Sequence, residues 1–238
     1  MDIKESKILG DQVDAHWYYR AKAAGLLRTV SECPIKEILD VGAGSGFFSR
    51  FLLTHTTAAR AVCVDPAYEA DSDAQCGGKP LAFRRTIERS DADTVLLMDV
   101  LEHVDDEAQL LRPYIDSVDR DTRFIITVPA FQFLWSSHDV FLEHRRRYTI
   151  SQLAATVERC GLALECCHYY FALVFPLAAA ARLLERALRS PDAAPRSQLR
   201  REPWLVNSAL TVLCAIERPF MRYNRMFGLS IFCVCRKR

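Results

Sequence analysis

Three glycines spaced two apart follow an apolar run in the stretch "ILDVGAGSGFF". They are Gly42, Gly44 and Gly46, and Asp40 stands before the first of them. Glycines let the backbone pass close to a ligand, and the N–H groups of a helix start favour an anionic group. A dinucleotide fingerprint reads G-x-G-x-x-G, but Phe47 occupies its last position here. The turn therefore predicts a small-molecule site, and Phe47 disfavours a nicotinamide cofactor.

A second group of chemically active residues lies in the stretch "AFQFLWSSHDVFLEHRRRY", which is too aromatic and too charged to be a simple connector. His138 stands beside Asp139, and His144 follows. A histidine titrates near neutrality and can take a proton from a substrate, or the same residues can order the loop through a hydrogen bond. Both interpretations stay open. A run of arginines suits either a solvated surface or the binding of a phosphate or carboxylate, and it consists of Arg145, Arg146 and Arg147.

Short apolar runs alternate with amphipathic segments in the elements that must position these residues. This pattern is typical of strand, helix and strand in a parallel sheet. Helices are expected from Gly46 towards His55, in "DDEAQLLRPYIDSV", and from near Thr149 to Cys160. Loops beyond the carboxyl ends of parallel strands are where such sheets place function. Seven strands are expected, in "EILDVG", "RAVCVDP", "LAFRRT", "DTVLLMDV", "TRFIITVP", "LALECCHYY" and "LSIFCVCRK".

An insertion without a strand pattern, residues 176–228, separates the last two predicted strands. Leu177, Ala181, Leu184 and Leu188 share one helical face, "SPDAAPRS" is a proline-rich break, and "WLVNSALTVLCAI" predicts a second helix. Nine arginines against four acids give the insertion a charge of +5, whereas the whole chain carries +1. Two interpretations stay open. The helices complete the core or form a dimer face, or they lie on an anionic membrane surface or cover a lipid-linked acceptor.

The composition excludes several classes of protein. A chain of 238 residues, half of them hydrophobic, suits one globular domain over residues 1–238, and a net charge of +1 does not indicate nucleic acid as a partner. The first residues do not read as a secretory signal, which favours the cytoplasm, with the inner membrane surface open as a location through the insertion. Uncharged runs are shorter than the roughly 20 residues of a spanning helix. Nine cysteines form no CxxC pair, so reduced thiols and no metal site are expected.

The stretch "DVGAGSG" reads D-x-G-x-G-x-G and resembles motif I of the class I S-adenosylmethionine-dependent methyltransferases. The resemblance covers most of the chain. "HWYYRAK", "LLMDVLEHVDD", "TVPAFQFLWSSHD" and "EHRRRYT" look like a bacterial subgroup of unassigned substrate, and only the domain resembles quinone-pathway O-methyltransferases. The resemblance implies S-adenosylmethionine as the cofactor and an α/β, doubly wound, mostly parallel seven-stranded sheet with a Rossmann-like methyltransferase fold. It also implies an antiparallel last strand, preceded by the helical insertion.

The resemblance further implies roles in binding the cofactor. In the family, the acid matching Asp40 and the glycine loop hold the methionine part, and the acid matching Asp65 binds both ribose hydroxyls, as a carboxylate can. An N-terminal helical lid, residues 1–30, closes over the cofactor, where Arg20 would pair with its carboxylate. Asp99 is equally a helix N-cap or a site residue. The expected cofactor-binding residues are Tyr18, Arg20, Asp40, Gly42, Ala43, Gly44, Gly46, Asp65, Pro66, Asp99 and Val100.

The sequence thus predicts methyl transfer to a small or lipid-linked acceptor, at oxygen and without metal. In an in-line displacement the enzyme contributes mainly by holding acceptor and methyl close together. His138 or His144, with Asp139, is the candidate to remove the acceptor proton. A nicotinamide-dependent oxidoreductase and a non-catalytic, membrane-linked scaffold of the same fold are the alternatives.

Overall fold

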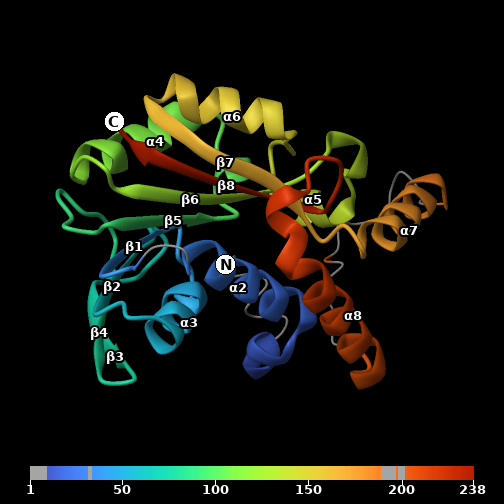
Figure 1. Cartoon of the computed structure of the whole chain (residues 1–238), viewed down its shortest axis with the longest axis horizontal. Helices are drawn as coiled ribbons and strands as arrows, with labels where there is room; N and C mark the ends of the chain where they lie inside the picture. The colour runs from blue at the N-terminus through green and yellow to red at the C-terminus, as the bar shows by residue number, and fades with distance from the viewer. Residues whose placement is uncertain (1–9, 32–33, 189–196, 198–201) are drawn as a thin grey trace.

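Within residues 10–31, 34–188, 197 and 202–238, which the computed structural model describes, eight strands form one sheet (Figure 1). Their order across the sheet is β3-β4-β2-β1-β5-β6-β8-β7. The strands are β1 (Glu37–Val41), β2 (Arg60–Val64), β3 (Ser72–Cys76), β4 (Lys79–Arg84), β5 (Thr94–Met98), β6 (Arg123–Pro129), β7 (Leu162–Tyr170) and β8 (Ser230–Lys237).

The central strands run parallel. β1 pairs with β2 and β5, and β5 pairs with β6, all in the parallel sense. β8 lies between β6 and β7 and is antiparallel to both. β5 is buried along its whole length, because helices cover both faces of the sheet, and this explains its continuous apolar sequence. The doubly wound, mostly parallel α/β fold and the antiparallel last strand are therefore confirmed.

The sheet has one strand more than the seven expected, because β3 and β4 form an antiparallel hairpin at one edge. Gly77 and Gly78 join them, with φ angles of 59° and 77°. Two consecutive left-handed residues make a tight hairpin turn that only glycine adopts without strain. The sequence of β3, "SDAQC", is largely polar, so it lacks a strand's apolar pattern. The Gly-Gly pair is the signal that could have revealed it.

Helices cover both faces of the sheet (Figure 1). α2, α3 and α8 supply Tyr19, Leu52 and Cys214 to one buried cluster, while α4 and α6 supply Leu111 and Leu153 to the other. The helices, including short 3-10 turns labelled η, are η1 (Gly10–Ala15), α2 (Trp17–Val30), α3 (Phe47–His55), η2 (Leu101–His103), α4 (Glu107–Ser117), η3 (Gln132–Leu134), α5 (Ser137–Phe141), α6 (Ile150–Arg159), α7 (Phe175–Leu188), α8 (Trp204–Glu217) and η4 (Arg218–Tyr223).

The N-terminal helix α2 packs against α8 of the insertion. The backbone N–H of Trp17 donates to Oδ1 of Asn207 at 2.8 Å, and Nδ2 of Asn207 donates to the carbonyl of Ala15 at 2.9 Å. The ring of Tyr18 stacks on Phe171, with 5.3 Å between centroids. These contacts join segments near opposite ends of the sequence. The part of the expected lid before residue 10 lies outside the described residues.

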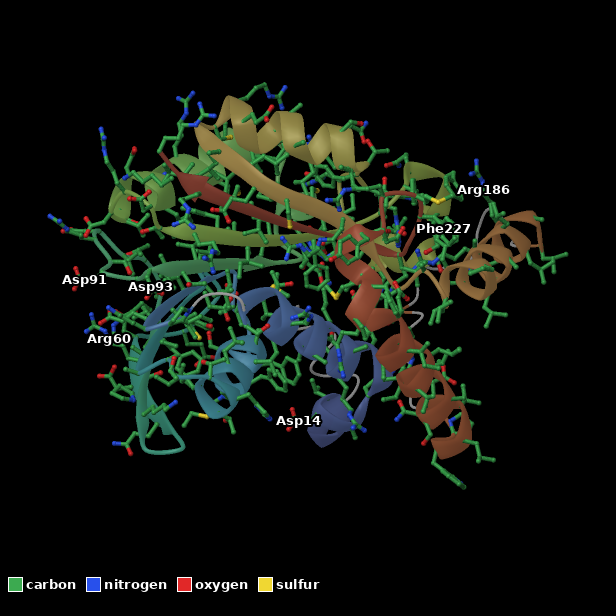
Figure 2. The ribbon with its side chains drawn as sticks, in the orientation of Figure 1. Asp14, Arg60, Asp91, Asp93, Arg186 and Phe227 are labelled. Carbon is green, nitrogen blue, oxygen red and sulfur yellow. The ribbon has the colours of Figure 1, made fainter. Side chains whose placement is uncertain are left out.

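Helices α7 and α8 project from the body at the end of the molecule opposite the β3–β4 hairpin (Figure 1). Leu177, Leu184 and Leu188 of α7 are 63%, 59% and 75% exposed, so their shared face is turned to solvent instead of completing the core. Figure 2 shows Arg186 and Phe227 at this same end. Apart from Ser197, the predicted break "SPDAAPRS" lies outside the described residues. None of the described helices has the length and apolar character to cross a membrane.

Candidate active site

The glycine turn leads from β1 into α3. Gly42 and Gly46 have φ angles of 65° and 72°, which L side chains rarely adopt. A Cβ atom at Gly42 would lie 2.8 Å from Cγ2 of Val100, and one at Gly46 would lie 3.2 Å from Sγ of Cys63. Both positions therefore require glycine, and the turn presents bare backbone beside Val100.

Asp65 follows β2 and reaches the glycine turn, as the sequence predicted. Its Oδ2 accepts a hydrogen bond from the backbone N–H of Gly44 at 3.0 Å, and its Oδ1 accepts one from the N–H of Ala67 at 3.0 Å. The hydroxyl of Tyr68 donates to the carbonyl of Gly44 at 2.7 Å. The carboxylate is thus fixed beside the turn. Among its neighbours, Ala43 lies in the turn and Pro66 is exposed after the strand.

Asp40 lies beneath the turn instead of at its surface. Only 1% of the residue is exposed, and Oδ2 accepts a hydrogen bond from the hydroxyl of Ser49 at 2.8 Å. Burial raises the pKa of Asp40 to about 6, although the hydrogen bond from Ser49 opposes the rise. This geometry ties β1 to α3, so Asp40 positions the turn from behind.

Asp99 forms an ion pair with a buried lysine that sequence reasoning missed. It follows β5 with a φ of 58°, and Oδ2 contacts Nζ of the fully buried Lys22. Nζ also donates to the Tyr18 hydroxyl at 3.0 Å, while the Thr127 hydroxyl donates to Oδ1 of Asp99 at 3.1 Å. Burial alone would raise the pKa of Asp99, but the charge and hydrogen bond of Lys22 hold it below its usual value. Asp99 does not cap helix α4, because Asp106 does, and its role as a site residue stays a prediction.

The side chain of Arg20 points away from the Lys22–Asp99 pair. Its side chain is exposed and lines a separate cavity with Asp14 and Arg50, on the outer side of α2. Tyr18 and Lys22, two positions to either side, face the interior instead. The structure thus places Arg20 away from Asp99, and its pairing with the cofactor carboxylate stays a prediction. Lys22, four residues after Tyr18, is the cation that contacts Asp99.

A cavity of about 750 Å³ opens beside this ion pair. Tyr18 and Asp99 form part of its wall, and the insertion supplies apolar side chains, among them Leu177, Val206 and Leu210. Polar groups gather on another part of the wall, where Glu102, His103, His138 and His144 lie. The cavity therefore joins the N-terminal helix, the loop after β6 and the insertion in one site.

Asp139 orients His144 and does not itself line the cavity. Its Oδ1 lies 3.0 Å from Nδ1 of His144, and both its oxygens accept hydrogen bonds from Arg147, at 2.7 and 3.0 Å. Burial alone would raise the pKa of Asp139, but the hydrogen bond from His144 and the charge of Arg147 hold it well below its usual range. Because an ionised carboxylate only accepts, Nδ1 carries the proton of this contact and Nε2 is the ring nitrogen left for other partners. Asp139 is thus a positioning residue.

His138 also lines the cavity, but its electrostatics do not suit a base. Burial, and then the charge of Arg182, lower the pKa of His138 to about 3. Such an imidazole is neutral at pH 7, yet it holds a proton weakly and is a poor general base. Nδ1 lies 3.5 Å from the hydroxyl of Ser197. Of the two predicted histidines, His144 is the better placed and the better oriented.

The three consecutive arginines are bound to acids of the same chain. Arg146 donates to Oε1 of Glu107 at 2.9 Å, and Arg147 is buried on Asp139. Arg145 is exposed, with Asp105 at 3.6 Å. Two of the three therefore hold the loop in place instead of forming a solvated surface.

Glu102 is a second residue that the sequence interpretation missed. It lies in η2, is completely buried, and neither carboxyl oxygen has a hydrogen-bond partner. Burial, and then the charge of Asp99, raise the pKa of Glu102 well above its usual value. His103, next in the chain, packs its ring edge-on against His144, with 4.8 Å between centroids. "LEH" after the fourth predicted strand was the only signal, and it does not reveal the burial.

A doubly wound sheet with an antiparallel strand beside its last parallel one, and a D-x-G-x-G-x-G turn that meets an acid after β2, define a class I methyltransferase. The profile of a family described as "Methyltransferase domain" matches residues 15–166. The chain belongs to this family, and the cofactor of the class is S-adenosylmethionine.

Solved structures share the fold. A putative methyltransferase in complex with the Trm112 methyltransferase activator of Haloferax volcanii has a TM-score of 0.56 and 16% identity, over 98% of this chain and 93% of that chain. Phosphoethanolamine N-methyltransferase 2 of Haemonchus contortus, in complex with S-adenosyl-L-methionine, has a TM-score of 0.58 and 14% identity, over 99% of this chain and 56% of that chain. An S-adenosylmethionine-dependent methyltransferase from Mesorhizobium loti has a TM-score of 0.55 and 13% identity, over 94% of this chain and 100% of that chain. No curated protein matches the chain by sequence.

Proposed function

We propose that the protein methylates an oxygen of a small or lipid-linked acceptor that binds in the 750 Å³ cavity. S-adenosylmethionine supplies an electrophilic methyl group when bound. The glycine turn and Asp65 would hold it, because a side chain at Gly42 would collide with Val100 and the Asp65 carboxylate is fixed beside Gly44. The Lys22–Asp99 pair, at the end of β5, would face its methionine part.

The polar part of the cavity wall is the observation that supports oxygen as the methylated atom. There His144, oriented by Asp139, lies beside His103 and Glu102. These groups suit a hydroxyl that must lose its proton as the methyl group arrives. The chain's main contribution to rate is to hold that hydroxyl in line with the methyl group. The apolar side chains of α7 and α8 would bind the rest of the acceptor.

Binding of S-adenosylhomocysteine, measured by calorimetry, tests the cofactor site. Asp65→Asn should raise the Kd at least about tenfold, since lost hydrogen bonds to a charged group are worth about 1.5–3 kcal/mol. Asp73→Asn is the matched control, because Asp73 lies on the exposed β3 and pairs with Arg84 at 2.7 Å. An unchanged Kd in Asp65→Asn, or thermal stabilisation by NAD instead, would contradict the assignment and favour the oxidoreductase or scaffold alternatives.

Transfer of a labelled methyl group to a panel of hydroxylated and aminated acceptors tests the reaction. We expect label in neutral, organic-extractable O-methyl products. An N-methylated amine stays cationic in acid and remains in water, so label found only there would reject the oxygen assignment. A panel should include quinols and lipid-linked alcohols, whose long apolar parts match the wall from α7 and α8.

We further propose that the insertion meets the inner face of an anionic membrane. All large hydrophobic side chains that are well exposed among the described residues come from residues 133–227. Leu177 and Val206 belong both to this surface and to the cavity wall, so a lipid-linked acceptor would pass from one to the other. Arg222 and Arg225 of the same region are exposed and could contact lipid phosphates. The helical apolar surface consists of Leu177, Leu183, Leu184, Leu188, Trp204, Leu205, Val206, Val212 and Ile216.

Co-sedimentation with phosphatidylglycerol vesicles tests this membrane contact. Leu184→Ser with Leu188→Ser, and separately Arg222→Ser with Arg225→Ser, should each release the protein into the supernatant. Arg85→Ser with Arg89→Ser is the charge-matched control, because both residues are exposed near the opposite end of the sheet. Equal pelleting of all forms, or none by the natural chain, would reject the contact while leaving the methyltransferase assignment intact.

A further inference from the structure

Three side chains able to bind a metal ion meet in the polar part of the cavity wall. Glu102, His103 and His144 each place one ligand atom within 4.8 Å of the others. The first two lie in η2 after β5, and the third lies in the loop after α5. Forty-one positions separate His103 from His144, which is why the sequence predicted no metal site. Two imidazoles and one carboxylate form a common ligand set for a divalent transition metal with open positions.

The state of Glu102 is the first argument for a cation. The residue is completely buried, and neither Oε1 nor Oε2 has a hydrogen-bond partner. A buried carboxyl group without a partner is costly in either protonation state, and native structures rarely retain one without a reason. The ion pairs nearby are already satisfied, because Lys22 binds Asp99 and Arg147 binds Asp139. Lys22 and Arg147 are therefore engaged elsewhere, and a bound cation would supply the missing partner of the Glu102 carboxyl oxygens.

The orientation of His144 is the second argument. Nδ1 donates to Asp139, and Arg147 fixes that carboxylate through two contacts of 2.7 and 3.0 Å. Histidine ligands of metals almost always donate their other N–H to a carboxylate or carbonyl in this way. The contact with Asp139 leaves Nε2 of His144 as the nitrogen that could bind a metal ion.

We propose that Glu102, His103 and His144 bind a divalent transition metal ion, with Zn²⁺ the ion best suited to this ligand set. Asp139 is then the group that orients a ligand. Open positions of the ion would face the cavity, where a bound acceptor hydroxyl would become more acidic and lose its proton to solvent. With the ion bound, His144 would act as a ligand and not as the base. The activation of an acceptor hydroxyl rests on the proposed function. The metal site itself does not depend on it.

Titration of the full chain with Co²⁺ tests the site directly, because cobalt absorbs visible light in a way that reports its ligands. We expect one Co²⁺ per chain, displaced by Zn²⁺, without the sulfur charge-transfer band that cysteine ligands produce. Glu102→Gln and His144→Gln should each weaken binding more than tenfold, and Asp139→Asn about 10–100-fold. His55→Gln, at an exposed site in α3, is the matched control and should bind as the natural chain does.

Binding of S-adenosylhomocysteine by each variant shows whether it is folded, and it separates failure of the metal site from failure of the proposed function. Three outcomes would overturn the proposal: no cobalt binding by the natural chain, equal binding by Glu102→Gln, or a spectrum dominated by sulfur ligands. Loss of cobalt binding in Glu102→Gln with unchanged binding of S-adenosylhomocysteine would support it.

Discussion

Replacing Gly42 by alanine is expected to damage the turn in two separable ways. A left-handed φ of 65° costs an L residue about 1–2 kcal/mol. The new Cβ would also lie 2.8 Å from Cγ2 and 3.2 Å from Cγ1 of Val100. Valine is stiff about its χ1 angle and cannot easily turn away, so overpacking adds about 1–3 kcal/mol. The total loss in the free energy of unfolding is therefore about 2–5 kcal/mol.

A double-mutant cycle separates the two terms. Val100→Ala removes both methyl groups that the new Cβ would meet, so Gly42→Ala in this background should cost only the left-handed backbone term. We expect a coupling of about 1–3 kcal/mol, well above the roughly 0.5 kcal/mol scatter of independent sites. Urea unfolding followed by circular dichroism measures all four forms. Additive losses would refute the steric argument, and a Gly42→Ala variant as stable as the natural chain would refute both terms.

Three further predictions concern the buried charges. Lys22→Met removes the cation that contacts Asp99, whose side chain is 27% exposed and keeps the hydrogen bond from Thr127. The change should cost about 1–3 kcal/mol in urea unfolding, most of which Asp99→Asn in the same chain should recover. The pKa of Asp40 is raised by burial to about 6, so its contribution to stability is present below pH 4 and is lost as pH rises through 6. Asp40→Asn should accordingly gain about 3 kcal/mol relative to the natural chain between pH 4 and 7.5, and a constant difference across that range would contradict the assigned pKa. Arg147→Lys cannot reproduce the two-pronged contact with Asp139 and should lower the Tm by several degrees at an unchanged Kd for S-adenosylhomocysteine; an unchanged Tm would show that the loop does not need that contact.

Local sequence patterns predicted most of the fold and the glycine turn. The burial of β5 explains its apolar run, and Asp65 could be located because it ends a strand adjacent to β1. The Lys22–Asp99 pair joins residues 77 positions apart, and no local pattern encodes it. Arg20 and Lys22 are equally plausible in the sequence, since two positions on a helix differ by about half a turn. Only packing against the sheet decides which of them faces inward.

The cavity could not be predicted from the sequence either, because packing between distant segments forms it. Glu102 reads as a surface acid at a helix start, and its burial follows from the loop whose N–H at Arg145 donates to the Glu102 carbonyl at 2.6 Å. The insertion was ambiguous because an amphipathic helix packs its apolar face on whatever is available. In the structure, the face that contains Leu184 has no cover within the described residues.

The hydrogen bond between Trp17 and Asn207 has a consequence for the order in which the chain folds during synthesis. The strands that hold the glycine turn are complete once residue 98 has been synthesised, but the partner of the first long helix appears 109 positions later. Contacts of such long sequence separation form late, because the loop they close costs entropy first. Nascent chains that stop before Trp204 would carry the strands around the glycine turn and a helix α2 without its contacts to α8. The part of the cavity wall that includes Val206 and Leu210 is therefore added long after the strands that hold the turn.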